Sequence, residues 1–418
     1  MTPPAPVAAP PSSALTPVHH HRVVVWLGWL MAHLIPVVWI ERYDTSTGDV
    51  HYYFVGVNDY VPGAMTEYPV VGTLPARLVN LLPGGEAAYI RWFVLVCILA
   101  SALFTAWLLH VDRDPGHRAA WFWLLFVGLS GPVLLTRLDI FPALTVAAFA
   151  ALLFAGSRTG RRAATVALAL ATMMKLWPGV LGAALVGGMR RRSTWARILW
   201  FFASLIVLCA AVAAVSGTDG LTTPLDYQSD RGLQIESLAA TPVMVAASFA
   251  ADAGTRWQIS YAASKSFEIT GPGAGVMTSV ASVATVVTVI AAVGWAVTRL
   301  LRDDWSPMQA LAFSVMTVAA VIATNKVFSP QYITWLAPLV AVALLVSRRR
   351  IVTVLALEVL VTALLTTCVY PVYYDWLLVV PTSTMAVLFL ALRNLGILVI
   401  LCTAAWWAVT ARRESAPR

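Results

Sequence analysis

The sequence predicts an all-α polytopic membrane protein, a bundle of about 12 membrane segments with two long outer loops. Hydrophobic residues make up 59% of the chain and charged residues only 11%, whereas soluble proteins carry roughly 25% charged residues. Apolar runs of about 20 residues recur along almost the whole chain, and each is long enough to cross ~30 Å of hydrocarbon as a helix. This composition excludes an ordinary soluble enzyme, a disordered chain, a β-barrel and a disulfide scaffold.

The apolar runs define the predicted spans, and the arginines between them define the orientation. The spans are residues 23–40, 90–110, 119–135, 139–156, 163–187, 196–215, 276–298, 306–324, 332–347, 351–370 and 384–410. Arginine clusters resist translocation and therefore mark the cytoplasmic side. These clusters are Arg22, Arg113 with Arg118, Arg158 with Arg161 and Arg162, Arg190–Arg192 with Arg197, Arg299 with Arg302, Arg348–Arg350, and Arg412 with Arg413.

One run, residues 163–187, has arginines near both ends, although a single crossing would put its ends on opposite sides. The motif Lys175-Leu176-Trp177-Pro178 lies at its midpoint, and proline breaks a helix because it lacks a backbone N–H. We therefore expect a broken hairpin of two half-spans, 163–174 and 178–188, with both chain termini in the cytoplasm. Broken backbone at membrane depth needs cover by protein or a watery cavity, and we expect Lys175 to face such a cavity.

The chain divides into one membrane domain and two short tails. Residues 1–22 form a proline-rich cytoplasmic tail that we expect to be disordered, residues 23–410 form the membrane domain, and residues 411–418 form a cytoplasmic tail. The first apolar run lacks a small-residue cleavage site and serves as an anchor rather than a signal peptide. The outer connections are 136–138, 325–331, 371–383 and the two long loops 41–89 and 216–275. Because most acidic residues lie on this outer face, we expect the site there.

The formal net charge of +8 does not indicate a nucleic-acid partner. The arginines lie mostly at span ends, and lysine occurs only at Lys175, Lys265 and Lys326. All cysteines fall inside apolar runs without the spacing of a metal site, so we expect them to be packing residues. Membrane lipids and the substrates are the expected partners, and no cofactor is expected.

The first outer loop contains a candidate catalytic base. Asp49, in the motif Gly48-Asp49-Val50-His51-Tyr52-Tyr53, follows the first span closely and is flanked by aromatic residues. A carboxylate held just above a membrane can have its pKa raised toward neutral, which suits a general base. A solvated loop carboxylate is the alternative for Asp49 and the favoured interpretation for Asp44 and Asp59. Because Asp49 and His51 make an incomplete ligand set, we expect no metal.

Charged residues also occur near the outer membrane boundary and inside the spans. Arg137 and Asp139 either bind substrate or have a structural role, in which Asp139 caps a helix and Arg137 pairs with it or snorkels. Lys175 at membrane depth is costly without a counter-charge, and phosphate is its natural partner. Arg393 lies about 14 Å below the outer end of the last span, at ~1.5 Å per residue, and can snorkel toward the same anion. Glu358 is expected to be an interhelical partner.

Two further outer segments are rich in polar side chains. Residues 227–237, YQSDRGLQIES, have a polar density unusual in this chain, although a solvated loop would have the same composition. Residues 325–335, NKVFSPQYITW, offer amide and ammonium donors that suit a phosphate or a sugar. Tyr332 and Trp335 either stack on a sugar ring or belong to the interfacial aromatic belt. The candidates in these segments are Arg231, Gln234, Glu236, Asn325, Lys326, Gln331 and Tyr332.

Together these motifs resemble the GT-C superfamily of polytopic glycosyltransferases, and within it the bacterial family 87 of polyprenol-phosphate-mannose-dependent α-mannosyltransferases of actinobacteria. The resemblance extends over residues 23–410. It rests on Gly48-Asp49 with Tyr53, Glu67-Tyr68-Pro69, Arg137-Leu138-Asp139, Lys175 with Pro178, Arg231-Gly232-Leu233-Gln234 with Glu236-Ser237, Asn325-Lys326 with Ser329-Pro330-Gln331-Tyr332, and Arg393-Asn394. The element from Asn325 to Tyr332 is also similar to one in the eukaryotic enzyme that adds the first mannose of the GPI anchor.

The resemblance implies a GT-C-like bundle in the plasma membrane, a polyprenyl-phosphate sugar donor and Asp49 as the catalytic base. Mannose is expected from the resemblance alone, and the acceptor is a lipid or glycan hydroxyl on the outer face. Cations must stabilise the departing phosphate, and the candidates are Lys175, Arg393, Arg231 and Lys326. Displacement with one carboxylate predicts inversion at the anomeric carbon. The expected substrate-binding residues are Tyr53, Glu67, Tyr68, Arg137, Asp139, Gln234, Glu236, Asn325, Gln331 and Tyr332.

A transporter or flippase of lipid-linked sugar intermediates is the alternative function. Transporters usually contain inverted repeats, with broken helices in both halves and polar sites at the midplane. This chain contains one visible broken span, and its large polar loops lie on one face. These features favour the glycosyltransferase.

Overall fold

The computed structural model describes residues 17–229 and 231–411. Of the predicted tails 1–22 and 411–418, residues 1–16 and 412–418 lie outside the described residues, whereas residues 17–22 belong to the first helix. Among the described residues, seven helices are long and apolar enough to cross a membrane, which defines a membrane-embedded, almost entirely α-helical protein. The number of about 12 segments stays a prediction.

The elements follow the predicted order of apolar runs. They are α1 (Pro17–Arg42), η1 (Asp44–Thr47), α2 (Gly48–Val57), α3 (Val70–Val79), α4 (Glu86–Val111), α5 (Arg118–Leu129), η2 (Gly131–Leu134), α6 (Ile140–Leu152), α7 (Arg158–Met174), η3 (Trp177–Leu185), α8 (Arg192–Ser216), α9 (Asp219–Ser229), α10 (Thr241–Phe249), α11 (Ala253–Arg256), β1 (Gln258–Tyr261), β2 (Phe267–Thr270), α12 (Ala274–Arg302), α13 (Pro307–Thr324), η4 (Pro330–Trp335), α14 (Ala337–Val346), α15 (Arg350–Thr367), η5 (Cys368–Val372), α16 (Tyr374–Leu377) and α17 (Thr384–Thr410).

The predicted break at Lys175 is present. Helix α7 ends at Met174, Lys175 adopts an extended conformation, and η3 follows as a 3₁₀ helix with Pro178 in its first turn. After η3 the chain returns to the arginine-rich end of the bundle. There the Met189 N–H donates to the carbonyl of Leu300, in the last turn of α12, at 3.0 Å. Residues 158–185 therefore form an out-and-back hairpin rather than a single crossing.

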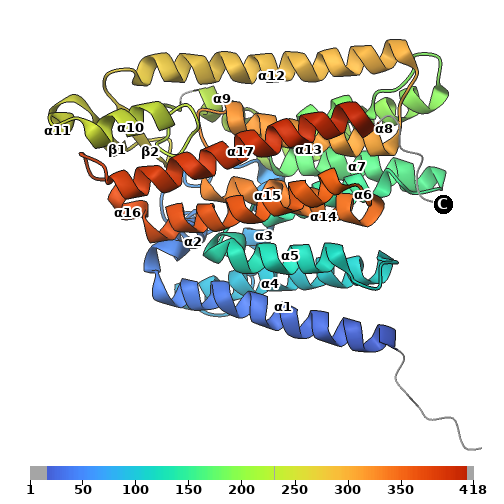
Figure 1. The fold of residues 1–418 in the computed structure, drawn as a ribbon, viewed down its shortest axis with the longest axis horizontal. Coiled ribbons are helices and arrows are strands. Elements are labelled where there is room, and N and C mark those ends of the chain that lie inside the picture. Colours follow the sequence, from blue (N-terminus) through green and yellow to red (C-terminus); the bar gives the residue numbers. More distant parts are fainter. Residues whose placement is uncertain (1–16, 230, 412–418) are drawn as a thin grey trace, which may run out of the picture.

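The two ends of the bundle differ in chemistry. The first turn of α1 and the last turn of α17 lie at one end, whereas α2, α10, α11, α16 and the β-strands lie at the other, here called the site end (Figure 1). Arginines predicted to be cytoplasmic gather at the end that holds the first turn of α1 and the last turn of α17. There Arg349 donates to Thr410 at 3.1 Å and Arg348 pairs with Asp114. The structure thus separates the arginine clusters from the polar loops, and the assignment of the site end to the outer face stays a prediction.

Burial distinguishes central from peripheral helices. In α13, 67% of the apolar window is buried, whereas α8 and α12 bury only 11% of theirs. Side chains such as Val283 and Ile290 on α12 are 63% exposed, as expected for a face that contacts lipid. Helix α12 accordingly runs along one edge of the bundle and α1 along the opposite edge (Figure 1). Glu358 on α15 accepts a hydrogen bond from Thr403 on α17 at 2.8 Å, which confirms it as an interhelical partner.

The long loops contain regular structure that the apolar pattern did not predict. The second loop holds α9, α10, α11 and a hairpin in which β1 pairs antiparallel with β2, with Tyr261 opposite Phe267. The segment 233–235 extends this hairpin on its other side: the Ile235 N–H donates to the Phe267 carbonyl at 3.1 Å, and the Ile269 N–H donates to the Leu233 carbonyl at 3.0 Å. This small sheet holds the 231–237 segment at the site end.

Candidate active site

Asp49 lies in the first turn of α2, where free backbone N–H groups favour an acidic side chain. Its Oδ2 atom is 2.8 Å from Nε of Arg137. The Arg137 side chain is 6% exposed and that of Asp49 is 39% exposed. The ion pair therefore fixes one carboxylate oxygen and leaves the group open to solvent.

The remaining donors of Arg137 are also occupied. Nη1 donates to the carbonyls of Ser46 and Thr136 at 3.3 and 3.0 Å, and Nη2 donates to the Tyr370 hydroxyl at 3.1 Å. Burial alone would lower the pKa of Arg137, but the Asp49 carboxylate and Tyr370 raise it above its ordinary value. Arg137 thus stays charged and holds Asp49 in a defined orientation.

Asp139 pairs with Lys175, at 2.5 Å between Oδ1 and Nζ, and also accepts from the Trp335 indole at 2.6 Å. The alternative in which Asp139 pairs with Arg137 is wrong, because Arg137 turns to Asp49 instead. Asp139 is the N-cap residue of α6 but makes no side-chain capping hydrogen bond, so that part of the alternative is wrong too. Arg137 and Asp139 lie two residues apart in the turn between η2 and α6. Because Arg137 binds Asp49 and Asp139 binds Lys175, this turn joins the four residues in one cluster.

Lys175 lies over an aromatic surface. Its Nζ atom is 5.2 Å from the ring centroid of Tyr332 and 5.1 Å from that of Trp335. These rings stack at 3.9 Å, and Trp335 stacks on Trp177 at 4.8 Å. The lysine side chain is 22% exposed, and a cation–π environment of this kind stabilises its charge.

Glu236 and Arg393 form a second, fully buried ion pair. Nη1 of Arg393 lies 2.7 Å from Oε2 of Glu236, and both side chains are 0% exposed. Nη2 of Arg393 donates to the Glu236 carbonyl, and Nε donates to Asn394 at 3.1 Å. Asn394 in turn donates to the Thr241 hydroxyl at 2.7 Å. This geometry favours a role for Arg393 in attaching the 231–237 segment to α17, because no donor of its guanidinium faces open space.

Gln234 joins the two polar segments that the sequence singled out. Its backbone N–H donates to the Lys326 carbonyl at 3.1 Å, and its side-chain Oε1 accepts from the Phe328 N–H at 2.6 Å. Asn325 stabilises the neighbouring turn by accepting from the Val327 N–H at 3.0 Å. Gln234 is 3% exposed, so it positions residues 325–328 from inside the protein.

Arg231 is a largely buried cation that forms no ion pair with a described carboxylate. Its guanidinium lies 4.8 Å from the ring centroid of Tyr227, and its Nε has no hydrogen-bond partner among the described residues. Burial would lower the pKa of Arg231, but Tyr332, Tyr227 and Tyr68 raise it. An arginine in such surroundings is suited to bind an anion.

Glu67 and the neighbouring tyrosines border the cluster. The Tyr52 hydroxyl donates to Glu67 at 3.1 Å and accepts from the Met65 N–H at 2.8 Å. Burial raises the pKa of Glu67, with the charges of Arg231 and Lys265 acting in the opposite direction. The rings of Tyr53 and Tyr68 meet edge to face at 5.8 Å, and burial raises the pKa of both hydroxyls. These phenols therefore serve as neutral hydrogen-bonding groups.

The other predicted residues lie around the same centre. Gln331 and Tyr332 are buried in η4, at 9% and 7% exposure, and Lys326 is half-buried. The structure thus groups Asp49, Arg137, Asp139 and Lys175 directly, links Gln234 to the Lys326 segment, and gives Glu236 and Arg393 a supporting position.

Several functional candidates escaped the sequence analysis. Tyr370 and Tyr374 extend the Asp49–Arg137 pair, since Tyr370 accepts a hydrogen bond from Arg137 and its ring meets that of Tyr374 edge to face at 5.0 Å. Glu268 accepts from the Gly232 N–H at 3.0 Å and so supports the Arg231 backbone. The tyrosine-rich motif Tyr370-Pro371-Val372-Tyr373-Tyr374 at the end of a predicted span was the available signal.

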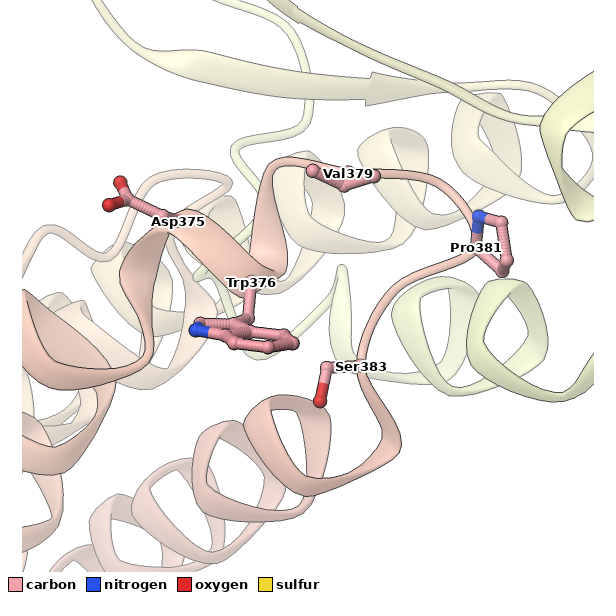
Figure 2. Close-up of a pocket in the computed structure, with 5 residues that line it drawn as sticks. All are labelled: Asp375, Trp376, Val379, Pro381 and Ser383. Atoms are coloured by element: carbon pink, nitrogen blue, oxygen red, sulfur yellow. The ribbon is translucent and has the colours of Figure 1, made fainter.

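A surface hollow of about 530 Å³ lies beside this motif, lined by Asp375, Trp376, Val379, Pro381 and Ser383. Figure 2 shows the Trp376 indole extending toward Ser383, with Val379 and Pro381 on the loop that leads to Ser383. Predicted site residues do not line it, and we place the candidate site at the Asp49 cluster because the charged groups converge there. Among the described residues, His, Cys, Asp and Glu form no group of three or more suited to a metal; the absence of a metal stays a prediction.

A membrane-embedded helical bundle with an accessible carboxylate and clustered cations at one end defines an integral membrane protein with an enzyme-like polar centre. The model of glycosyltransferase family 87 matches residues 66–330, more than half of the chain. The chain therefore belongs to glycosyltransferase family 87 and is a membrane glycosyltransferase, which decides against the flippase alternative. The match includes Glu67, Arg137, Asp139, Lys175 and Arg231, whereas Asp49 and Arg393 lie outside it. No curated protein and no solved structure matches the chain.

Proposed function

We propose that this protein transfers a sugar from a polyprenyl-phosphate donor to a hydroxyl of a lipid or glycan acceptor, and that the sugar is mannose. The observation that carries the proposal is the difference in exposure among three acids of the cluster. The Asp49 side chain is 39% exposed, whereas those of Asp139 and Glu236 are 2% and 0% exposed and are bound by cations. Asp49 is thus the acid among these three that an acceptor hydroxyl can reach.

Asp49 acts as general base in the proposed step. Its second carboxylate oxygen takes the proton of the acceptor hydroxyl, because Oδ2 is engaged by Arg137. The acceptor oxygen forms a bond to the anomeric carbon while the bond from that carbon to the phosphate oxygen breaks. The polyprenyl phosphate leaves with the bonding electrons. One displacement with one carboxylate inverts the anomeric configuration.

Cations near Asp49 stabilise the departing phosphate in this proposal. Lys175 is partly exposed above the aromatic surface, and Arg231 has a free Nε and no described carboxylate partner. Lys326 lies on the segment that Gln234 attaches to the Arg231 loop. Charge-assisted hydrogen bonds from such groups are strongest where negative charge develops. Arg393 supports this arrangement indirectly, because its ion pair with Glu236 attaches the 231–237 segment to α17.

The membrane setting suits a lipid-linked donor. The polyprenyl chain stays in the bilayer while its headgroup reaches the site end, which we propose to be the outer face of the plasma membrane. The arginine clusters at the opposite end support this orientation, since positive charge is retained in the cytoplasm. Polyprenyl phosphate, the acceptor and membrane lipids are then the partners, and no cofactor takes part.

The test uses the full-length protein in lipid nanodiscs with radiolabelled polyprenyl-phosphate mannose and a panel of acceptor hydroxyls. We expect sugar transfer to be matched by equal release of polyprenyl phosphate. NMR of the product should show an inverted anomeric configuration. Retained configuration would contradict the single-displacement mechanism, and absence of both donor turnover and transfer across polyprenyl-phosphate sugars would contradict the proposed donor.

A further inference from the structure

The β1–β2 hairpin is attached to the Arg231 loop by Glu268. The Glu268 carboxylate accepts from the Gly232 N–H at 3.0 Å and from the hydroxyl of Ser264 in the hairpin turn. The Ala262 N–H donates to the Ser266 carbonyl at 2.9 Å, which closes this turn. The hairpin is therefore a defined element of the site end rather than a loose loop.

A chain of aromatic contacts connects the exposed end of the hairpin with the Asp49 ion pair. Tyr261 meets Phe267 edge to face at 5.2 Å, and Phe267 meets Tyr374 at 6.1 Å. Tyr374 contacts Tyr370 at 5.0 Å, and Tyr370 accepts a hydrogen bond from Arg137 at 3.1 Å. Tyr261 is thus the outermost ring of a continuous row that ends at the partner of Asp49.

Tyr261 is 60% exposed, in contrast to the other rings of this row. Partial burial and the negative charges of Asp49 and Glu67 raise the pKa of its hydroxyl. The charge of Lys265 in the hairpin turn acts to lower the pKa of Glu67. The Glu268–Gly232 contact therefore places the hairpin beside the Arg231 loop, and the aromatic row links it to Arg137, the partner of Asp49.

We propose that Tyr261 is an acceptor-binding residue whose exposed ring stacks on a sugar ring of a saccharide-bearing acceptor. This inference rests on the proposed function. The acceptor hydroxyl must approach the exposed Asp49 oxygen, and Tyr261 on β1 presents an exposed ring at the same end of the bundle as α2. Aromatic faces bind the apolar C–H faces of sugars while phenol and carboxylate groups bind the hydroxyls. Tyr261 therefore selects an acceptor that carries a sugar over a simple lipid alcohol.

The test compares n-octyl α-D-mannopyranoside with n-octanol, two probes with the same alkyl chain, on the full-length protein in nanodiscs. Wild-type protein should use the glycoside as acceptor and not the alcohol. Tyr261→Ala should raise KM for octyl mannoside about tenfold, equivalent to ~1.4 kcal/mol, and leave kcat and hydrolysis of the donor nearly unchanged. Tyr261→Phe should retain the wild-type KM, because it keeps the ring. Tyr60, 66% exposed on the first outer loop, provides the control Tyr60→Ala, which should have no effect.

A second readout separates this inference from the proposed function. Saturation-transfer NMR without donor measures octyl mannoside binding directly, and Tyr261→Ala should weaken the signal while Tyr60→Ala should not. Equal binding by wild type and Tyr261→Ala, or an unchanged KM, would overturn the role of Tyr261 while leaving the transferase intact. Loss of binding in Tyr261→Ala together with a wild-type protein that never consumes donor would support the subsite and contradict the proposed donor.

Discussion

The Asp49 carboxylate is held by the buried guanidinium of Arg137 at 2.8 Å, although the two residues lie on different segments of the chain. Arg137 is itself fixed by the Ser46 carbonyl and the Tyr370 hydroxyl. A base oriented in this way loses little entropy when the acceptor arrives, because its supporting groups are already in place. The predictions below follow from this cluster and from the elements that support it.

The Asp139–Lys175 pair allows a structural role of Lys175 to be separated from a role in donor binding. Lys175→Met alone should destabilise the protein by about 3–5 kcal/mol, because it leaves Asp139 buried without its cation. The double variant Asp139→Asn/Lys175→Met should recover much of the thermal stability, since both charges are gone. We nevertheless expect it to transfer sugar at least tenfold more slowly at subsaturating donor. Wild-type donor kinetics in the double variant would contradict phosphate binding by Lys175.

The Glu236–Arg393 pair should act on stability more than on chemistry. Glu236→Gln leaves the Arg393 charge buried without a carboxylate, which typically costs about 3–5 kcal/mol, and we expect thermal unfolding in nanodiscs to begin several degrees lower. Glu86→Gln is the matched control, because Glu86 pairs with His51 at the surface, where such a pair contributes about 0–1 kcal/mol. Equal unfolding temperatures for the two variants would contradict the supporting role of Glu236.

A side chain at Gly232 would meet the carboxylate of Glu268, which must move to make room for it. A Cβ atom at Gly232 would lie 2.1 Å from Oε2 of Glu268, so Gly232→Ala must displace this carboxylate and shift the Arg231 loop. We expect KM for the donor to rise about five- to tenfold, equivalent to ~1–1.4 kcal/mol, which lies in the range of one weakened hydrogen bond. Gly275→Ala, where a Cβ meets nothing within 4 Å, should behave as wild type. An unchanged donor KM in Gly232→Ala would remove Arg231 from donor binding.

Glu67 predicts a pH dependence of stability. Burial raises its pKa in the folded protein, so the folded state binds the proton more tightly than the unfolded state does. This contribution to stability is present at low pH and is lost as the pH rises through the folded pKa. Glu67→Gln lacks it, so the unfolding temperature of the variant should increase relative to wild type between pH 4 and pH 8. A difference that stays constant or reverses would contradict the buried environment of Glu67.

Much of the fold follows from local sequence patterns. Every predicted apolar run coincides with helical structure, and Pro178 together with the flanking arginines predicts the break beside Lys175. The hairpin of β1 and β2 escaped prediction because its strands are only four residues long and lie in a loop without an alternating pattern. Periodicity indicates which residues are helical, and it carries no information on such short strands.

The residues of the candidate site could be predicted from the sequence better than the ion pairs that they form. Residue type and position identified Asp49, Arg137, Asp139 and Lys175, but the sequence offered Asp139 as the partner of Arg137. Tertiary packing decides otherwise, because the turn before α6 directs Arg137 to α2 and Asp139 to the tip of the α7–η3 hairpin. Arg393 was expected to snorkel toward the surface, whereas in the structure it is buried and pairs with Glu236 of the 231–237 segment. Contacts of this kind depend on how distant helices pack.

The central claim is that Asp49 removes the proton from the acceptor. The most direct test measures donor binding and single-turnover sugar transfer on the same nanodisc preparation of Asp49→Asn, with Asp59→Asn as a control at an exposed position of the same loop. The account predicts that Asp49→Asn binds polyprenyl-phosphate mannose within about threefold of wild type and transfers it at least ~100-fold more slowly, while Asp59→Asn behaves as wild type. Transfer by Asp49→Asn at the wild-type rate would contradict the account.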